Sequence, residues 1–326
     1  MSDVLITVDT ELSAGRQARG LDVRANFASA ILGRTARGDF GIGWQMDRLE
    51  AHGLKGVYFV DPMPALVHGE AVIADIVGPI VARGHEVQLH IHTEWLEWAK
   101  ESPIGGRRGR NIGDFSLADQ TILLGLARDI LVRAGAPAPI AFRAGNFGAD
   151  DNSLKALAAI GIAWDASVNP AYLGDDCRIS FPADRAAAAT LEGVTEVPVA
   201  GLYDRPGHFR PAQVCAMSAA EMRAALRHAA AARNFAFVIV THSFEMLSRD
   251  RLRPNRTVTA RFESLCRAIA GTPGLRAAGF ADLDAAALVR APAAADRLSS
   301  NYLHTAGRLA EQILATWRYE RRLLPA

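Results

Sequence analysis

Cysteine is scarce in this chain, with three residues among 326. Cys177, Cys215 and Cys266 lie far apart in the sequence and form no C-x-x-C pair. This distribution argues against a disulfide scaffold and against a cysteine zinc site. It is typical of proteins from a reducing compartment.

Two kinds of apolar segment are also missing. The N-terminus has no basic segment followed by an apolar one, so we expect no secretory signal. No run of about 18 apolar residues could span a bilayer, so we expect no transmembrane segment. We therefore predict a cytoplasmic location.

An excess of charge of either sign is absent as well. The 36 basic and 35 acidic residues leave a formal net charge of +1. This balance disfavours bulk electrostatic binding to nucleic acid or to an anionic membrane. Arg107, Arg108 and Arg110 form one short basic cluster, which we interpret as a solvated loop.

The sequence does contain short β-rich runs that alternate with amphipathic helical stretches. Eight strands are predicted, over residues 4–10, 55–60, 86–92, 139–145, 162–168, 194–200, 235–242 and 275–280. Strand and helix in alternation indicate a parallel α/β fold. Seven or eight such units fit a deformed (β/α)7–8 barrel with an extra C-terminal helix.

We divide the chain into a barrel over residues 1–288, a linker over 289–298 and a C-terminal helix over 299–326. Segment 12–41 is long and rich in Arg and Gly, and it follows the first strand directly. Loops after strand C-termini build the active site of a barrel, so we interpret it as an active-site loop, with disorder as the alternative. The final helix could pack on the barrel, on a second subunit or on a membrane surface, which leaves a homo-oligomer open.

Polar side chains gather at the ends of the first and third predicted strands. Because side chains alternate faces along a strand, Asp9 and Glu11 share one face, and so do His90 and His92. The residues opposite the two histidines are aliphatic, as expected for a strand backed by helices. The histidine face must then point to a polar place, which in a barrel is its C-terminal mouth.

These side chains predict a metal site, with a hydrogen-bonded structural role as the alternative for each of them. Imidazole with carboxylate suits zinc, iron, manganese or cobalt. Glu94, four residues after His90, is a rival ligand if a helix begins there.

Three further strand ends carry groups of a functional type. Arg143 follows an apolar run, Asp165 follows Trp164, and His242 follows a nearly uninterrupted apolar stretch. An arginine in such a place can orient a carboxylate or bind an anionic group. Each could be structural, but polar residues at several strand ends together favour a catalytic centre.

This series resembles the NodB-like polysaccharide deacetylase superfamily, also called carbohydrate esterase family four. VDTE (8–11) stands at the family's opening aspartate pair, and HGLKGVYFVDP (52–62) is similar to its second strand. GHEVQLHIHTEW (84–95) matches the run into its histidine motif, and FRAGNFG (142–148) its arginine motif. Asp165 falls at the fourth motif and VTH (240–242) at the closing Leu-x-His motif, so the resemblance runs in order from about residue 4 to about residue 282.

The resemblance implies a metal-dependent deacetylase on a deformed barrel, and it implies roles for single residues. Asp9 would be the general base that activates a metal-bound water, and Arg143 would orient it. His242 would be the general acid that protonates the leaving amine. Asp165 would pair with His242 and hold it charged, while His90 matches the first metal histidine.

The chain departs from the family pattern at two positions. The family's second aspartate, a metal ligand, is Thr10 here, and Glu11 is the nearest carboxylate. The second metal histidine is replaced by Glu94, and we favour His92 as its substitute because alternation puts it beside His90. We therefore expect a divalent ion at Glu11, His90 and His92, most readily Zn and otherwise Fe, Co, Mn or Ni. Asp9 and Glu94 are rival ligands, and an enzyme without metal stays open.

The sequence thus predicts a hydrolase that removes an acetyl or formyl group from an amino sugar or sugar conjugate. Because no secretion signal is visible, a nucleotide- or lipid-linked sugar fits better than a cell-wall polymer. One alternative is a hydrolase of a small non-sugar amide or cyclic ureide that needs no metal. Another is a non-catalytic carbohydrate-binding protein on the same fold. The expected partner in each case is a small molecule or glycan conjugate and not nucleic acid.

Overall fold

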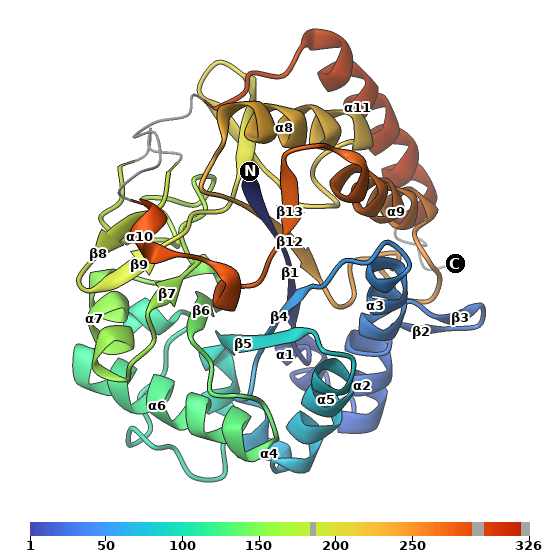
Figure 1. Ribbon diagram of the computed structural model, residues 1–326. Coiled ribbons are helices and arrows are strands. Elements are labelled where there is room, and N and C mark those ends of the chain that lie inside the picture. The colour runs from blue at the N-terminus through green and yellow to red at the C-terminus, as the bar shows by residue number, and fades with distance from the viewer. Residues whose placement is uncertain (183–186, 289–296, 321–326) are drawn as a thin grey trace.

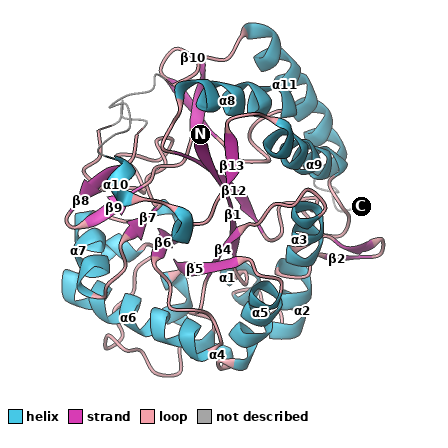
Figure 2. Ribbon diagram, in the orientation of Figure 1, coloured by secondary structure: helices cyan, strands magenta, loops and turns pink. Residues whose placement is uncertain are grey.

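The computed structural model describes residues 1–182, 187–288 and 297–320. A curled, mostly parallel sheet occupies the centre, and helices surround it (Figures 1 and 2). The strand order is β12-β1-β4-β5-β6-β7-β9-β8, and β13 pairs with the start of β1. The strands are β1 Ser2–Thr10, β4 Val57–Val60, β5 Glu86–Ile91, β6 Ala141–Ala144, β7 Trp164–Asp165, β8 Ala189–Leu191, β9 Val194–Glu196, β12 Ala236–His242 and β13 Leu275–Ala277.

The sheet curls almost to closure. Val199, just beyond β9, forms a bridge with Val238 of β12, and Gln213 forms one with Val240. In this sheet the β8–β9 pair is antiparallel, whereas every other strand pair is parallel. The predicted deformed barrel is therefore confirmed, and each of the eight predicted strand segments overlaps an observed strand.

Helices cover the outside of this sheet (Figure 2). They are α3 Ile42–Glu50, α4 Ala65–His68, α5 Ala71–Ala82, α6 Leu117–Arg133, α7 Asp151–Ala159, α8 Ala219–Ala232, α9 Arg256–Gly271 and α10 Ala285–Leu288. No helix in the described ranges is both long enough and apolar enough to cross a membrane.

Alternation along β1 separates two cores. Leu5 points into the barrel, where it joins an apolar cluster with Phe59, Trp164 and Phe280. Its neighbour Ile6 belongs instead to the core between the sheet and the outer helices. Burying side chains of this size stabilises the fold by about 1.5–3 kcal/mol each, so a one-residue slip of β1 would be costly. The same alternation turns Asp9 toward the barrel interior.

Segment 12–41 carries secondary structure of its own. It contains α1 Ala14–Gln17, α2 Val23–Ala30 and a small hairpin of β2 Arg34–Thr35 with β3 Gly38–Asp39. Ser13 and Asp22 cap the two helices, because their side chains accept hydrogen bonds from the first backbone N–H groups. The segment is therefore folded rather than an irregular loop, and its action as a substrate cover stays a prediction.

The C-terminal helix α11, Tyr302–Ala315, lies on the outside of α8 and α9 (Figure 1). Its buried Arg308 donates to Asp204 at 2.7 Å and to Glu221 at 3.1 Å. Most of the predicted linker 289–298, and the end of the predicted helix 299–326, lie outside the described residues. The division of the chain into these parts stays a prediction.

Candidate active site

The ends of four parallel strands bring the predicted site residues together. Asp9 lies opposite His242 in the β1–β12 pair and opposite Phe59 in the β1–β4 pair. His90 lies opposite Arg143 in the β5–β6 pair. Residues far apart in the sequence therefore meet at one edge of the barrel, as predicted for its C-terminal mouth.

Glu11, His90 and His92 form a compact group of ligand atoms. Each offers one atom, and these atoms lie within 4.8 Å of one another. Glu11 Oε2 is 3.2 Å from His90 Nε2 and 2.5 Å from His92 Nε2. The three residues that alternation selected as ligands are thus assembled around one point.

The hydrogen bonds of His90 test whether this group suits a cation. His90 Nδ1 lies 2.7 Å from the carbonyl oxygen of Arg143, which can only accept, so Nδ1 carries the proton. In the neutral ring, Nε2 then presents a lone pair to the Glu11 carboxylate, and two acceptors face each other. A cation between them, either a proton or a metal ion, resolves this conflict. The arrangement is the one that metal-ligating histidines adopt, with the remote nitrogen bonded to a carbonyl.

His92 is held from two sides by carboxylates. Its Nε2 faces Glu11, and its Nδ1 lies 3.1 Å from Glu94 Oε2. Partial burial would lower the pKa of His92, but the charge of Glu11 and bonds to both carboxylates raise it well above its usual value. Glu94 therefore contacts the remote nitrogen of His92 and lies outside the three-residue group. The expected helical spacing from His90 does not arise, because residues 93–97 form a 3-10 helix.

Gly145 makes room for His92. A Cβ atom at residue 145 would lie 2.6 Å from the Ile91 carbonyl oxygen and 2.8 Å from His92 Nδ1. Both distances are too short for a side chain. The glycine after the β6 arginine is therefore needed for His92 to reach Glu11.

Asp9 and Arg143 form a buried ion pair inside the barrel. Arg143 donates from one terminal nitrogen to Asp9 Oδ1 and to Thr7 Oγ1, both at 2.7 Å, and from Nε to the Ala166 carbonyl at 3.1 Å. Burial raises the pKa of Asp9, but the charge of Arg143 outweighs it with help from His90 and His242, so the pKa falls below its usual value. The predicted contact of Arg143 with Asp9 is confirmed, and Asp9 is held ionised.

The predicted pairing of Asp165 with His242 is wrong. His242 Nδ1 lies 3.1 Å from Glu245 Oε2, and the His242 backbone N–H donates to the same oxygen at 2.8 Å. Loss of water around His242 would lower its pKa, but the hydrogen bond and charge of Glu245 raise it to about 9. Its other nitrogen, Nε2, is 3.9 Å from Asp9 Oδ2.

Asp165 has other partners, which explains why it does not pair with His242. It accepts a hydrogen bond from Ser167 Oγ at 2.6 Å and lies opposite Glu196 in the β7–β9 pair. Burial raises the pKa of both Asp165 and Glu196, and the charge and hydrogen bond of Asp165 raise that of Glu196 further. One proton shared between them satisfies such a pair.

Sequence reasoning missed Asp61, Glu196 and Glu245. Asp61 directly follows β4, and its Oδ1 accepts from the Met63 N–H at 3.0 Å and the His92 N–H at 3.4 Å. Burial raises the pKa of Asp61 to about 7. The signal for Asp61 was present, because an acidic residue after the apolar run VYFV is the pattern used for Asp9. Glu245 could also be found, since it stands three residues after His242.

Comparisons with known proteins support the fold. No family model matches the chain, and no curated protein matches it by sequence. Among solved structures, a Mycobacterium smegmatis protein classed provisionally as a polysaccharide deacetylase aligns with a TM-score of 0.55 and 16% identity, over 92% of this chain and 94% of that one. This likeness confirms the fold that the NodB-like resemblance predicts.

Two further structures align less closely. The 4-alpha-glucanotransferase from Thermococcus litoralis has a TM-score of 0.48 and 9% identity, over 86% of this chain and 40% of that one. A family 4 carbohydrate esterase from Streptomyces lividans, in complex with acetate, has a TM-score of 0.41 and 13% identity, over 85% and 92%.

Proposed function

We propose that this protein is an amide hydrolase that removes an acetyl or formyl group from an amino sugar or sugar conjugate. The observation that carries the proposal is the position of Asp9 and His242. An ionised carboxylate and a protonated imidazole lie 3.9 Å apart beside the group of Glu11, His90 and His92. The M. smegmatis structure, named for polysaccharide deacetylation, supports the choice of substrate class.

Glu11, His90 and His92 would hold a divalent metal ion, for which zinc is the first candidate. Two imidazoles and a carboxylate are a ligand set that catalytic zinc sites use. When bound, such an ion lowers the pKa of water towards about 7 and polarises a carbonyl group.

Asp9 is placed to act as the general base. Its carboxylate stays ionised because Arg143 compensates its charge, and it can accept a proton from the water that attacks the acyl carbon. The hydrogen bond from Arg143 fixes Oδ1, which leaves Oδ2 directed toward His242. Arg143 is thus a positioning residue for Asp9.

His242 is placed to act as the general acid. With a pKa of about 9, it is protonated at neutral pH and can donate a proton to the amine that leaves. Glu245 binds Nδ1, so Nε2 is the nitrogen available to the substrate. In this proposal Glu245 takes the role that the family resemblance gave to Asp165.

An assay of amine release tests the proposal. The full chain, supplied with Zn²⁺, is incubated with N-acetyl and N-formyl amino sugars in free, nucleotide-linked and lipid-linked form. We expect release from at least one of them, and His242→Ala and Asp9→Asn should abolish it. Absence of release from every substrate in this set would refute the proposal.

The departures at Thr10 and Glu94 favour a second candidate, a metal-independent hydrolase of a small amide or cyclic ureide. Elemental analysis of the active protein separates the two candidates. Turnover by protein that contains far less than one metal ion per chain would support the second candidate and oppose the first.

The predicted cytoplasmic location is part of the proposed function, and fractionation of the source cells tests it.

A further inference from the structure

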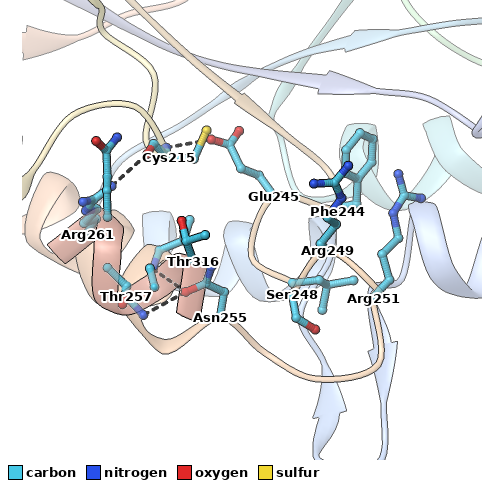
Figure 3. A pocket seen from close by; sticks show the side chains of 14 residues that line it. Cys215, Phe244, Glu245, Ser248, Arg249, Arg251, Asn255, Thr257, Arg261 and Thr316 are labelled. Carbon is cyan, nitrogen blue, oxygen red and sulfur yellow. Dashed lines mark hydrogen bonds between the residues drawn. The ribbon is translucent and has the colours of Figure 1, made fainter. Parts of the chain in front are cut away.

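A pocket of about 630 Å³ lies beside His242, between the turn after β12, the start of α9 and the end of α11 (Figure 3). Its wall includes Phe244, Glu245, Arg249, Arg251 and Thr257. Figure 3 shows Phe244, Arg249 and Arg251 together along one side. The pocket is thus rich in arginine and shares Glu245 with the acid histidine.

Arg251 has an unusual backbone conformation and unusual surroundings. Its backbone has φ 61°, the left-handed region that a residue with a side chain rarely adopts. Its guanidinium carbon lies 3.8 Å from the centre of the Phe244 ring, and that ring lies 5.4 Å from the ring of His242. One terminal nitrogen of Arg251 is buried without a hydrogen-bond partner in the described structure. A buried donor without a partner is unfavourable, and a ligand acceptor would satisfy it.

A second arginine without a carboxylate partner lines this pocket. Arg249 stands on the same side of the pocket as Arg251 (Figure 3). Burial, together with the charges of Arg16 and Arg19 and against an opposing effect of Glu11, lowers the pKa of Arg251 to about 10. Neither Arg249 nor Arg251 forms an ion pair with a carboxylate in ranges 1–182, 187–288 and 297–320. Glu11 is already engaged with His90 and His92, so it does not neutralise Arg251.

Two further features favour an anion here. Helix α9 begins at the pocket wall, and the N-terminus of a helix carries partial positive charge. Glu245, the acidic residue of the wall, has its carboxylate occupied by His242 and by the backbone N–H of Cys215, which donates to it at 2.7 Å.

We propose that Arg251, with Arg249, binds a phosphoryl group of the substrate, one aromatic ring away from His242. This inference rests on the proposed function and narrows its substrate to N-acylated amino sugars that carry a phosphate or diphosphate. The two guanidinium groups leave positive charge on this wall, and their forked donors match phosphate oxygens.

Binding measurements on the full chain test this subsite. We compare N-acetylglucosamine with N-acetylglucosamine 1-phosphate by calorimetry, using the unmodified protein, Arg251→Gln and Arg251→Lys. The matched control is Arg133→Gln. Arg133 is a half-exposed arginine at the end of α6, where the chain returns to the end of the barrel opposite the site. We expect the phosphate to tighten binding by about 10- to 100-fold, as charge-assisted hydrogen bonds do.

That preference should disappear in Arg251→Gln, persist in part in Arg251→Lys and be unchanged in Arg133→Gln. If Arg251→Gln does not fold, the exposed Arg249→Gln takes its place and should weaken the preference. Equal binding of the two sugars by the unmodified protein would overturn the proposal. So would a preference that Arg251→Gln or Arg249→Gln leaves intact.

The test of the phosphate subsite and the test of the proposed function can fail independently. An Arg251-dependent preference for phosphate without any amine release refutes the hydrolase and leaves the subsite. Amine release with equal kcat/KM for neutral and phosphorylated sugars refutes the subsite and leaves the hydrolase. A parallel arm with phosphatidylcholine vesicles containing a polyprenyl phosphate distinguishes a lipid headgroup from a soluble phosphate. Arg251-dependent binding to these vesicles, beside the Arg251-dependent preference for the sugar phosphate, indicates a lipid-linked substrate. The preference for the sugar phosphate without vesicle binding indicates a soluble one.

Discussion

Asp9 and Asp165 are buried aspartates at the ends of parallel strands of one barrel, yet their neighbours set opposite charge states. Arg143 lies 2.7 Å from Asp9 and lowers the pKa of that carboxyl against the effect of burial. Asp165 lies opposite Glu196 instead of a cation, and burial raises its pKa. The comparison teaches that a carboxylate at a strand end is suited to base catalysis only where a buried cation compensates it.

Replacing each aspartate by asparagine should reveal the largest difference between them, in catalytic activity. We expect Asp9→Asn to lower kcat by about 10²- to 10⁴-fold, the usual contribution of general acid–base catalysis. Asp165→Asn should change kcat only a few-fold, because a neutral amide resembles the protonated acid. Amine release under substrate saturation measures both, with circular dichroism to confirm folding. Similar losses in the two variants would remove the distinction.

The partners of the two aspartates should differ almost as much in their effect on stability. Arg143→Met leaves Asp9 as an uncompensated buried charge, and we expect a loss of about 3–5 kcal/mol in the free energy of unfolding. Glu196→Gln supplies an amide donor to Asp165 in place of the shared proton, so we expect a change within about 1 kcal/mol. Urea unfolding measures both. A larger loss for Glu196→Gln would show that the carboxyl pair is not protonated.

The pH dependence of activity should distinguish Glu245 from Asp165 as the partner of His242. Because the pKa of His242 is about 9, kcat/KM should fall as pH rises through that value. Glu245→Gln removes the stabilising charge, so this fall should move to lower pH. Asp165→Asn should leave it in place. If only the Asp165 variant moved it, the assignment of Glu245 would be refuted.

The smallest effect we expect is on the pH dependence of stability. The folded-state pKa of Glu196 is raised well above 4.5, so its contribution is fully present below that pH. This contribution is lost as pH rises through the folded-state pKa. Glu196→Gln should therefore lessen the decline of stability above pH 4.5. Unfolding free energies at a series of pH values, compared with those of the matched surface variant Glu192→Gln, provide the measurement.

Much of the fold and the ligand group could be predicted because strand alternation is local. The period of two fixes which side chains of residues 4–11 and 86–92 share a face, whatever the rest of the chain does. Glu11, His90 and His92 follow from that rule, and the structure assembles them. The short strands β2, β3 and β8 span only two or three residues each, too few for a periodic signal.

The partners of single side chains were harder to predict, because they depend on contacts between strands. Asp165 was assigned to His242 by the family's motif order, whereas the β7–β9 register places Glu196 opposite it. Glu245 reaches His242 through a turn that begins at the end of β12, and no strand period describes a turn. Arg143 was found because its partner Asp9 faces the barrel interior from a strand of known period.

The pairing of β1 with β12 also sets an order of events during synthesis. Thr7 donates to the Ile239 carbonyl across 232 positions of sequence, in the same strand pair that places Asp9 opposite His242. At about 5–20 residues per second, a ribosome needs roughly 10 to 50 s to cover that distance. His90 is only 79 positions from Glu11, so the three proposed metal ligands are translated long before His242. The residues that would hold an ion are therefore complete on the nascent chain before the proposed acid–base pair can form.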